Sequence, residues 1–377
     1  MSSAIPAATH LFSPLTQRGI TLPNRIAVSP MCQYNSVDGF ASDWHLVHLG
    51  SRAIGGAGVV ITEACAISPE GRISPGDLGI WKDEHIAPLA RITGFIREHG
   101  SVPGIQLAHA GRKASMTPPW GGPRNVPPAE GGWENVIGPS AERYSPTYPV
   151  PQAMDRAAMD KVLADIAAAT KRAAAAGFLL AEIHAAHGYL ANEFLSPVSN
   201  LRTDEYGGSL ANRARFPLEM IRTARKAWPE NLPLWVRVSV TDWVEGGLTV
   251  DDSVEFAKML KAEGVDLVDV SSGGNDHRQQ IPIGPGYQVA FAERLRREAG
   301  IATGAVGMIS EPAQADQILR SGQADVVLLA RELLRDPYWP LRAAAELKQP
   351  ESWPIQYERA ARGQVERRTA LQTGPAE

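Results

Sequence analysis

Two histidines and a tyrosine, His184, His187 and Tyr189, stand close together just after an apolar run of the sequence. Histidines three residues apart suggest metal ligands, but a zinc site needs three or four ligands and no third one accompanies this pair. The spacing therefore does not favour a metal site. Two ordinary core histidines are the simplest alternative to a role in chemistry.

Other side chains that can do chemistry also stand where apolar runs end. They are Cys32, Tyr34, Glu63, Ala64, Gln106, Arg237, Ser271, Gly307 and Arg331. This set offers no carboxylate pair for hydrolysis and no lysine for a Schiff base, since Lys113 lies several residues past the third run. The loops after the last two runs instead suit a phosphate-binding site. Gly307 permits close approach of the backbone, and Arg331 can pair a phosphate in a bidentate manner.

The elements that must position these residues are short apolar runs that alternate with helices. The runs cover residues 25–29, 59–64, 103–108, 178–183, 234–239, 265–271, 302–306 and 325–329. The helices are expected at residues 43–54, 83–98, 155–176, 212–228, 250–263, 290–299, 311–321 and 337–347. Continuous Val, Ile and Leu is typical of parallel strands that are covered on both faces.

Eight such units predict an α/β fold, a single (β/α)8 TIM barrel, whose catalytic residues lie at the carboxyl ends of the strands. A doubly wound open sheet is the alternative. That fold usually carries G-x-G-x-x-G after its first strand. Here the sequence Gly55-Gly56-Ala57-Gly58 precedes a strand, and we interpret it as a helix end and a turn.

The barrel is expected to span residues 1–359, with one long insertion. Residues 117–151, after the third strand, are rich in Pro and Gly and are expected to form a lid or capping hairpin on the active-site face. A passive surface loop is the alternative. The tail at residues 360–377 is polar and aperiodic, and we expect it to be disordered.

Composition excludes several classes of protein. The 377 residues include 37 Lys and Arg against 41 Asp and Glu, a net charge of −4 that argues against a nucleic-acid partner. There is no polybasic run and no apolar run of about 18 residues, so no membrane association is expected. Two cysteines, Cys32 and Cys65, cannot form a disulfide scaffold, and the N-terminus does not look like a signal peptide. These features predict a cytoplasmic protein.

Four segments together carry a family resemblance. They are residues 24–34 (NRIAVSPMCQY), 106–112 (QLAHAGR), 184–190 (HAAHGYL) and 202–209 (RTDEYGGS), the last followed by Asn212-Arg213. In this order the sequence resembles the Old Yellow Enzyme family of NADH:flavin oxidoreductases. Cys32 places it with the bacterial, cysteine-containing branch that includes xenobiotic reductases. The resemblance covers residues 11–359 and implies FMN as cofactor, with NADPH or NADH as reductant.

The resemblance implies a flavin site built from the strand ends. Gln106 would hydrogen-bond the pyrimidine edge of the ring, and Arg237 would stabilise negative charge on the reduced ring near N1. A satisfied buried amide and a structural ion pair are the alternatives for these two residues. Further contacts with the ring or the phosphate would come from Ser29, Pro30, Met31, Cys32, Ala64, Gly307, Ala330 and Arg331.

The resemblance also implies how a substrate is bound and reduced. His184 and His187 would donate hydrogen bonds to a carbonyl or nitro oxygen, and Tyr189 would give a proton to Cα after hydride arrives at Cβ. Cys32 would tune the flavin potential, and Tyr34 would be a second hydrogen bond to the substrate. A buried small hydrophobe is the alternative for a lone cysteine and fits Cys65 well.

The segment Gln356-Tyr357-Glu358-Arg359 resembles a C-terminal motif in which the arginine reaches a neighbouring subunit's active site. It implies a homodimer or homotetramer in which Arg359 crosses the interface and contributes to substrate binding. A solvated arginine near a chain end is the alternative.

The leading hypothesis is an FMN-dependent NAD(P)H:acceptor oxidoreductase, an ene-reductase. By ping-pong turnover it would reduce activated C=C bonds of α,β-unsaturated carbonyl compounds and related nitro compounds. The alternative is a non-flavin TIM-barrel lyase or aldolase with a phosphate site at the seventh and eighth strands. It would need a lysine or a metal centre at the strand ends.

Overall fold

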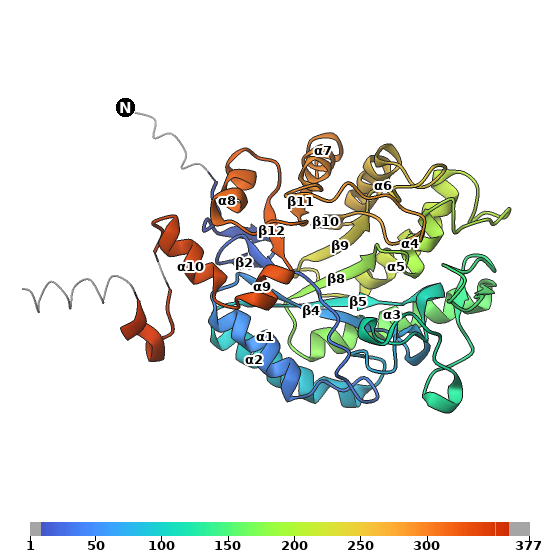
Figure 1. Cartoon of the computed structure of the whole chain (residues 1–377), viewed down its shortest axis with the longest axis horizontal. Helices are drawn as coiled ribbons and strands as arrows, with labels where there is room; N and C mark the ends of the chain where they lie inside the picture. Colours follow the sequence, from blue (N-terminus) through green and yellow to red (C-terminus); the bar gives the residue numbers. More distant parts are fainter. Residues whose placement is uncertain (1–8, 351, 362–377) are drawn as a thin grey trace, which may run out of the picture.

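The eight apolar runs form a closed barrel of parallel strands in the computed structural model, which describes residues 9–350 and 352–361. In chain order the strands are β3 (Ile26–Val28), β4 (Val59–Ala66), β5 (Val102–Ala108), β8 (Leu180–Ala185), β9 (Leu234–Ser239), β10 (Leu267–Ser271), β11 (Ala302–Ala305) and β12 (Val326–Leu329). Pairing of β12 with β3 closes the ring (Figure 1). The predicted (β/α)8 TIM barrel is confirmed.

Helices connect the strands and cover the outside of the barrel. They are α1 (Asp43–Ile54), α2 (Ile86–Glu98), α3 (Arg156–Ala175), α4 (Leu190–Leu195), α5 (Leu210–Ala227), α6 (Val250–Ala262), α7 (Val289–Ala299), α8 (Pro312–Arg320), α9 (Arg331–Arg335) and α10 (Trp339–Glu346). Side-chain caps fix where α3 and α6 begin, since Asp155 accepts from the Ala158 N–H and Thr249 from the Asp252 N–H. The two short helices α4 and α9 were not predicted, and they begin in the loops that carry Tyr189 and Arg331.

An N-terminal hairpin closes the amino end of the barrel. Strands β1 (Leu15–Gln17) and β2 (Ile20–Leu22) pair antiparallel, and Leu22 is fully buried in the apolar cluster inside the barrel. The Trp235 indole N–H, from β9, donates to Gln17 Oε1 at 2.8 Å. Side chains therefore fill the interior of the barrel at its amino end, and the predicted site residues lie at the carboxyl end.

The insertion after β5 lies at the right-hand end of the barrel in Figure 1, opposite α10. It contains the short strand β6 (Ile137–Gly138), which pairs with β7 (Gln152–Ala153) just beyond it. The pairing is parallel, so the expected hairpin is wrong, because the chain between the two strands crosses back instead of turning directly. Short 3-10 helices account for the remaining elements: η1 (Pro69–Gly71), η2 (Asp83–His85), η3 (Gly111–Lys113), η4 (Pro119–Gly121), η5 (Pro128–Glu130) and η6 (Ile355–Ala360).

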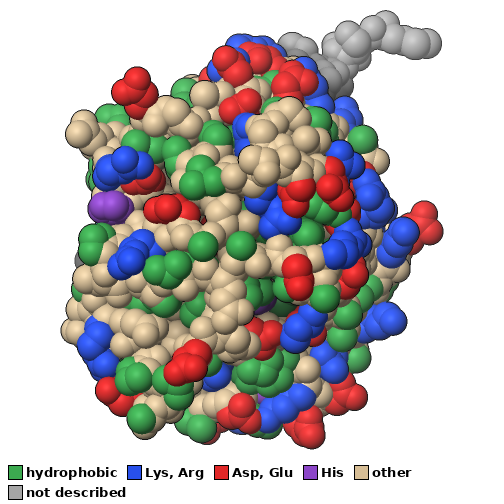
Figure 2. All heavy atoms as spheres, turned by 90° about the vertical axis from the view of Figure 1, so that its right-hand side faces the viewer, with side chains coloured by type: hydrophobic (Ala, Val, Ile, Leu, Met, Phe, Trp, Pro, Cys, Tyr) green, Lys and Arg blue, Asp and Glu red, His purple; other side chains and the backbone are tan. Residues whose placement is uncertain are grey.

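Figure 2 shows the face at this right-hand end, where acidic and basic side chains are interspersed. Within residues 9–350 and 352–361, no helix has the length and apolar character needed to cross a bilayer. The predicted disordered tail falls mainly on residues 362–377, which lie outside the described residues.

Candidate functional site

The predicted site residues converge because each follows or ends a barrel strand. Ala64 pairs in register with Gln106, and His184 pairs with Arg237, so the side chains of each pair share one side of the sheet. Members that the fold brings to the carboxyl end of the barrel are Ser29, Pro30, Met31, Cys32, Tyr34, Ala64, Gln106, His184, His187, Tyr189, Arg237, Gly307, Ala330 and Arg331. Arg359 is the one predicted residue outside this group.

Arg237 and Gln106 are held by buried partners on neighbouring strands. Arg237 Nη1 donates to Ser29 Oγ at 3.1 Å, and its Nε forms an ion pair with Asp269 Oδ2 at 3.2 Å. Gln106 Nε2 donates to Glu182 Oε1 at 2.8 Å. Both alternatives raised by the sequence, an ion pair and a bonded amide, are thus present. Both side chains can still form hydrogen bonds with a ligand, because a guanidinium has five N–H donors and the Gln106 side-chain oxygen is still an acceptor.

His184 has a defined tautomer. The Ala186 N–H donates to its Nδ1 at 3.2 Å, so in the neutral ring the proton sits on Nε2. Burial, together with the positive charges of Arg237 and Lys113, holds the pKa of His184 well below its usual range. The ring is therefore a neutral donor with an N–H left to offer.

His187 and Tyr189 face the same space as His184. The ring centroids of the two histidines are 5.2 Å apart, and those of His184 and Tyr189 are 4.8 Å apart. His187 Nε2 lies 2.7 Å from Ser271 Oγ, and burial and the charge of Arg237 lower the pKa of His187 well below its usual range. Burial raises the pKa of Tyr189 well above its usual range, so its hydroxyl keeps its proton near neutral pH.

The loop after β3 carries Cys32 and Tyr34. Glu63 anchors this loop, since its carboxylate accepts from the Gln33 N–H at 2.9 Å. Burial and the nearby carboxylates of Asp77 and Glu63 raise the pKa of Cys32, while the Ala64 N–H and the Tyr34 hydroxyl hydrogen-bond its sulfur. Cys32 is thus a thiol that is partly exposed at the mouth.

Cys65, in contrast, is fully buried in the main apolar core, and the packing role expected for it is confirmed.

A cavity of about 340 Å³ extends from Arg237 to the loops after β11 and β12. Ser271, Gly307, Ala330 and Arg331 line it. Gly307 has φ +122°, a conformation that other residues rarely adopt, and a Cβ there would lie 2.8 Å from Gln288 Nε2. The position therefore requires glycine. Arg331 and the backbone at Gly307 line the cavity, as a phosphate needs, and the Arg237 guanidinium lines it as well.

These residues fit FMN by their own chemistry. Arg237 and Arg331 both line the cavity, and the Gln106 Oε1 atom, which the bond to Glu182 leaves available, matches the single N–H of the flavin's pyrimidine edge. No three His, Cys, Asp or Glu side chains of the described ranges gather in a way that would hold a metal ion.

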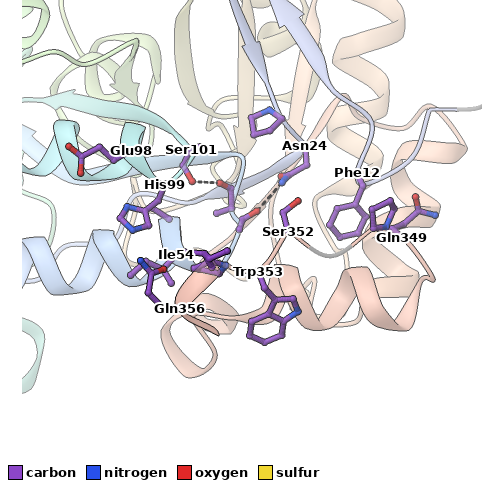
Figure 3. A pocket seen from close by; sticks show the side chains of 18 residues that line it. Phe12, Asn24, Ile54, Glu98, His99, Ser101, Gln349, Ser352, Trp353 and Gln356 are labelled. Carbon is purple, nitrogen blue, oxygen red and sulfur yellow. Dashed lines mark hydrogen bonds between the residues drawn. The ribbon is translucent and has the colours of Figure 1, made fainter. Parts of the chain in front are cut away.

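Arg359 lies elsewhere. It is exposed on η6, next to the C-terminal residues that border a second cavity of about 790 Å³. Figure 3 shows this cavity, where Trp353 and Gln356 lie across from Asn24 and Ser101, which come just before β3 and β5. Arg359 is therefore at the amino end of the barrel, and within one chain it does not join the site.

Sequence reasoning set aside one polar side chain near the site, Lys113, and missed two others, Glu182 and Asp269. Lys113 Nζ donates to the carbonyls of His187 and Gly274 at 2.9 and 2.7 Å, and burial lowers its pKa to about 7. Glu182 and Asp269 point into the barrel, and each stands two residues before a residue at a strand end, His184 and Ser271. The alternation of side chains along a strand is the signal that could have revealed both.

Comparison with known proteins identifies the family. The model of the family described as NADH:flavin oxidoreductase / NADH oxidase matches residues 10–350. The NADPH dehydrogenase of Geobacillus thermodenitrificans (strain NG80-2) is 50% identical over 356 residues, which cover 94% of this chain and 99% of that protein. The NADPH dehydrogenase of Bacillus subtilis (strain 168) is 47% identical over 354 residues, which cover 93% of this chain and 99% of that protein.

Solved structures agree. Morphinone reductase superposes with a TM-score of 0.76 at 26% identity, and the match covers 92% of each chain. A 2-naphthoyl-CoA reductase complex superposes with a TM-score of 0.80 at 25% identity over 90% of this chain, which spans about half (52%) of that longer chain. Nothing in these matches favours the lyase or aldolase alternative. The chain belongs to the NADH:flavin oxidoreductase / NADH oxidase family, the Old Yellow Enzyme family that its motifs resemble, and it is an FMN-dependent NAD(P)H oxidoreductase.

Proposed function

We propose that the carboxyl end of the barrel holds FMN with its ring over Gln106 and Arg237 and its phosphate at Gly307, Ala330 and Arg331. Ser29, Pro30, Met31, Cys32 and Ala64 would line the ring. The observation that carries this proposal is the cavity between Arg237 and Arg331, because one continuous space joins a donor for the ring to a donor for the phosphate. Bound FMN supplies a hydride that it has received from NAD(P)H.

We further propose that His184 and His187 bind the substrate's carbonyl or nitro oxygen. Two neutral imidazole N–H groups aimed at one oxygen stabilise the negative charge that grows there when hydride reaches Cβ. His187 would exchange its contact with Ser271 for this oxygen. Tyr189 would then donate its proton to Cα, which suits a hydroxyl that burial keeps protonated. Tyr34 would add a second hydrogen bond to the substrate.

The substrates would be activated alkenes, namely α,β-unsaturated carbonyl compounds and related nitro compounds. NAD(P)H and the alkene would use the same mouth in turn. The insertion at residues 117–151 would form a lid over it, because its Trp120 ring packs edge-on against Tyr34 at 5.4 Å. Its Tyr144 ring lies 4.3 Å from Lys113 Nζ, next to Tyr189.

Stopped-flow measurement of the two half-reactions tests this function. Flavin reduction by NADPH and by NADH is followed first, and flavin reoxidation is then followed with a panel of enones and nitro compounds. We expect both halves to proceed independently and enones to reoxidise the flavin at saturable rates. Reoxidation by dioxygen alone, with no response to any alkene or nitro compound, would leave the proposed substrates without support.

We propose that the enzyme acts as a homodimer or homotetramer in which Arg359 reaches the mouth of a neighbouring copy. Arg359 is exposed and lies outside the site of its own chain, which supports a role at the site of a second copy. The cytoplasm is the proposed location, in keeping with two free cysteines, Cys32 and Cys65, which suit a reducing compartment.

Replacing Arg359 by Ala should raise the KM for bulky acceptors about tenfold, since losing one hydrogen bond from a charged donor costs roughly 1.5 kcal/mol. The KM for each acceptor and the range of acceptors are compared with those of Arg342→Ala, which removes an arginine from α10 that pairs with Asp336. Unchanged KM values and an unchanged acceptor range in R359A would refute the proposed role of Arg359 in substrate binding.

A further inference from the structure

A buried polar layer crosses the barrel at the level of Gln106 and Arg237. It consists of Gln106 (β5), Glu182 (β8), Arg237 (β9) and Asp269 (β10), with exposed fractions of 1%, 0%, 6% and 0%. Gln106 pairs in register with Glu182, and Arg237 pairs with Asp269. Gln106 and Arg237, over which the ring is proposed to lie, are thus each held by a carboxyl group on the adjacent strand.

This layer is not built for stability. Arg237 pairs with Asp269, and its charge also acts on Glu182. Neither Glu182 Oε2 nor either oxygen of Asp269 has a hydrogen-bond partner among the described residues. Burial raises the pKa of both carboxyl groups, which shows how poorly they are solvated. Burying charges in this way often costs more than well-packed apolar side chains would, so the layer calls for another explanation.

We propose that Glu182 and Asp269 are positioning residues of the flavin site: Glu182 fixes the amide of Gln106, and Asp269 fixes the guanidinium of Arg237 and offsets its charge. This inference rests on the proposed placement of the ring over Gln106 and Arg237. Through these two carboxyl groups, the neighbouring strands set both the affinity of the site for FMN and the reduction potential of the bound flavin.

Glu182 acts through the orientation of one amide. A glutamine can present either its carbonyl or its NH₂ group to a ligand. Because Glu182 Oε1 takes the Nε2 group at 2.8 Å, Gln106 turns its carbonyl oxygen outward. That oxygen can accept the hydrogen bond that the N–H of the flavin's pyrimidine edge donates. An NH₂ group in the same place could not, because both groups would be donors.

Asp269 acts through charge. Its Oδ2 lies 3.2 Å from Arg237 Nε, close enough to hold the guanidinium in place and to oppose part of its positive charge. A full positive charge near the ring would favour the reduced, more negative flavin strongly. Asp269 therefore keeps the potential of the bound flavin lower than Arg237 alone would set it.

The Glu182 arm is tested by FMN release from the holoenzyme, followed on dilution through the fluorescence of free FMN. We expect E182M to speed release at least about tenfold, the effect of one lost hydrogen bond of roughly 1.4 kcal/mol. E182Q keeps an oxygen for Gln106 and should stay within about twofold of the unchanged protein by the same reasoning. In a Gln106→Met background, E182M should add nothing, because the two residues act as one unit.

The Asp269 arm is tested by the midpoint potential of the bound flavin. The double variant E182Q/D269N is compared with E182Q, so that Glu182 cannot ionise in place of Asp269. We expect the ratio of reduced to oxidised FMN affinity to rise at least about tenfold, which for a two-electron couple is about 30 mV more positive. D266N is the matched control. It breaks the carboxylate–guanidinium pair with Arg18 at the amino end of β10 and should leave the potential unchanged.

The possible outcomes distinguish the positioning role of Glu182 and Asp269 from the proposed placement of the flavin. If Gln106→Met and Arg237→Met alter neither FMN release nor potential, the proposed flavin placement is wrong. If they do so while E182M and E182Q/D269N behave like the unchanged protein, the positioning role is refuted and the flavin placement stands. Should E182M fail to fold, Glu182→Ala gives the same comparison.

Discussion

Replacing Tyr189 by Phe should slow alkene reduction by about 10²–10⁴-fold, the range for loss of a positioned general acid. Flavin reduction by NADPH should remain nearly intact, because no proton from Tyr189 is needed in that half-reaction. The physical reason is that burial keeps the Tyr189 hydroxyl protonated and that the Tyr189 ring packs against His184, with the two ring centroids 4.8 Å apart. Stopped-flow rates of the two half-reactions, measured separately, check this expectation.

Tyr206→Phe is the control, since it removes a tyrosine hydroxyl that bonds Glu219 outside the site. It should change neither half-reaction. An equal loss in both half-reactions of Y189F would mean that Tyr189 positions the flavin or NADPH and is not simply the proton donor. A Y189F enzyme with normal alkene reduction would assign the proton to another group or to water.

The double variant His184→Ala/His187→Ala should lose most binding of phenols, which mimic the substrate's anionic oxygen. It should also slow alkene reduction by at least about 10²–10³-fold, the loss typical of a single oxyanion donor. The His184 tautomer leaves its Nε2–H as a donor. His187 would exchange the contact of its Nε2 with the Ser271 hydroxyl for a contact with the phenol oxygen. Calorimetric titration with a phenol measures the binding directly.

His99→Ala is the matched control, because His99 lies at the other cavity, at the amino end of the barrel. It should bind phenols like the unchanged enzyme. Tight phenol binding by the double variant would refute the oxyanion role and would return the two histidines to the status of ordinary core residues.

The sequence predicts the barrel well because its strands are apolar on both faces. The run at residues 234–239 coincides with β9, and the helix at residues 43–54 coincides with α1. The rule that catalytic residues lie at the carboxyl ends of the strands placed His184 and Arg237 at the same end of the barrel, where they pair in register on β8 and β9. What failed were elements too short to show a period: the hairpin β1–β2, the helices α4 and α9, and the parallel pair β6–β7.

The buried carboxyl groups were missed for a different reason. Glu182 and Asp269 interrupt apolar runs, and a barrel strand with one inward polar group still appears apolar overall. Lys113 was judged too distant along the chain, although the η3 turn folds it back to the carbonyl of His187. The role proposed for Arg359 would depend on a second copy of the chain, which no local pattern of the sequence describes.

One measurement tests the central claim most directly, that one barrel mouth takes a hydride from NADPH and gives it to an alkene. Purified protein is titrated with NADPH under anaerobic conditions while the flavin absorbance at about 450 nm is followed. An enone is then added. The account predicts a yellow protein, bleached by one equivalent of NADPH and restored by one equivalent of enone. A colourless protein that FMN cannot reconstitute, or a bleached one that no enone recolours, would contradict it.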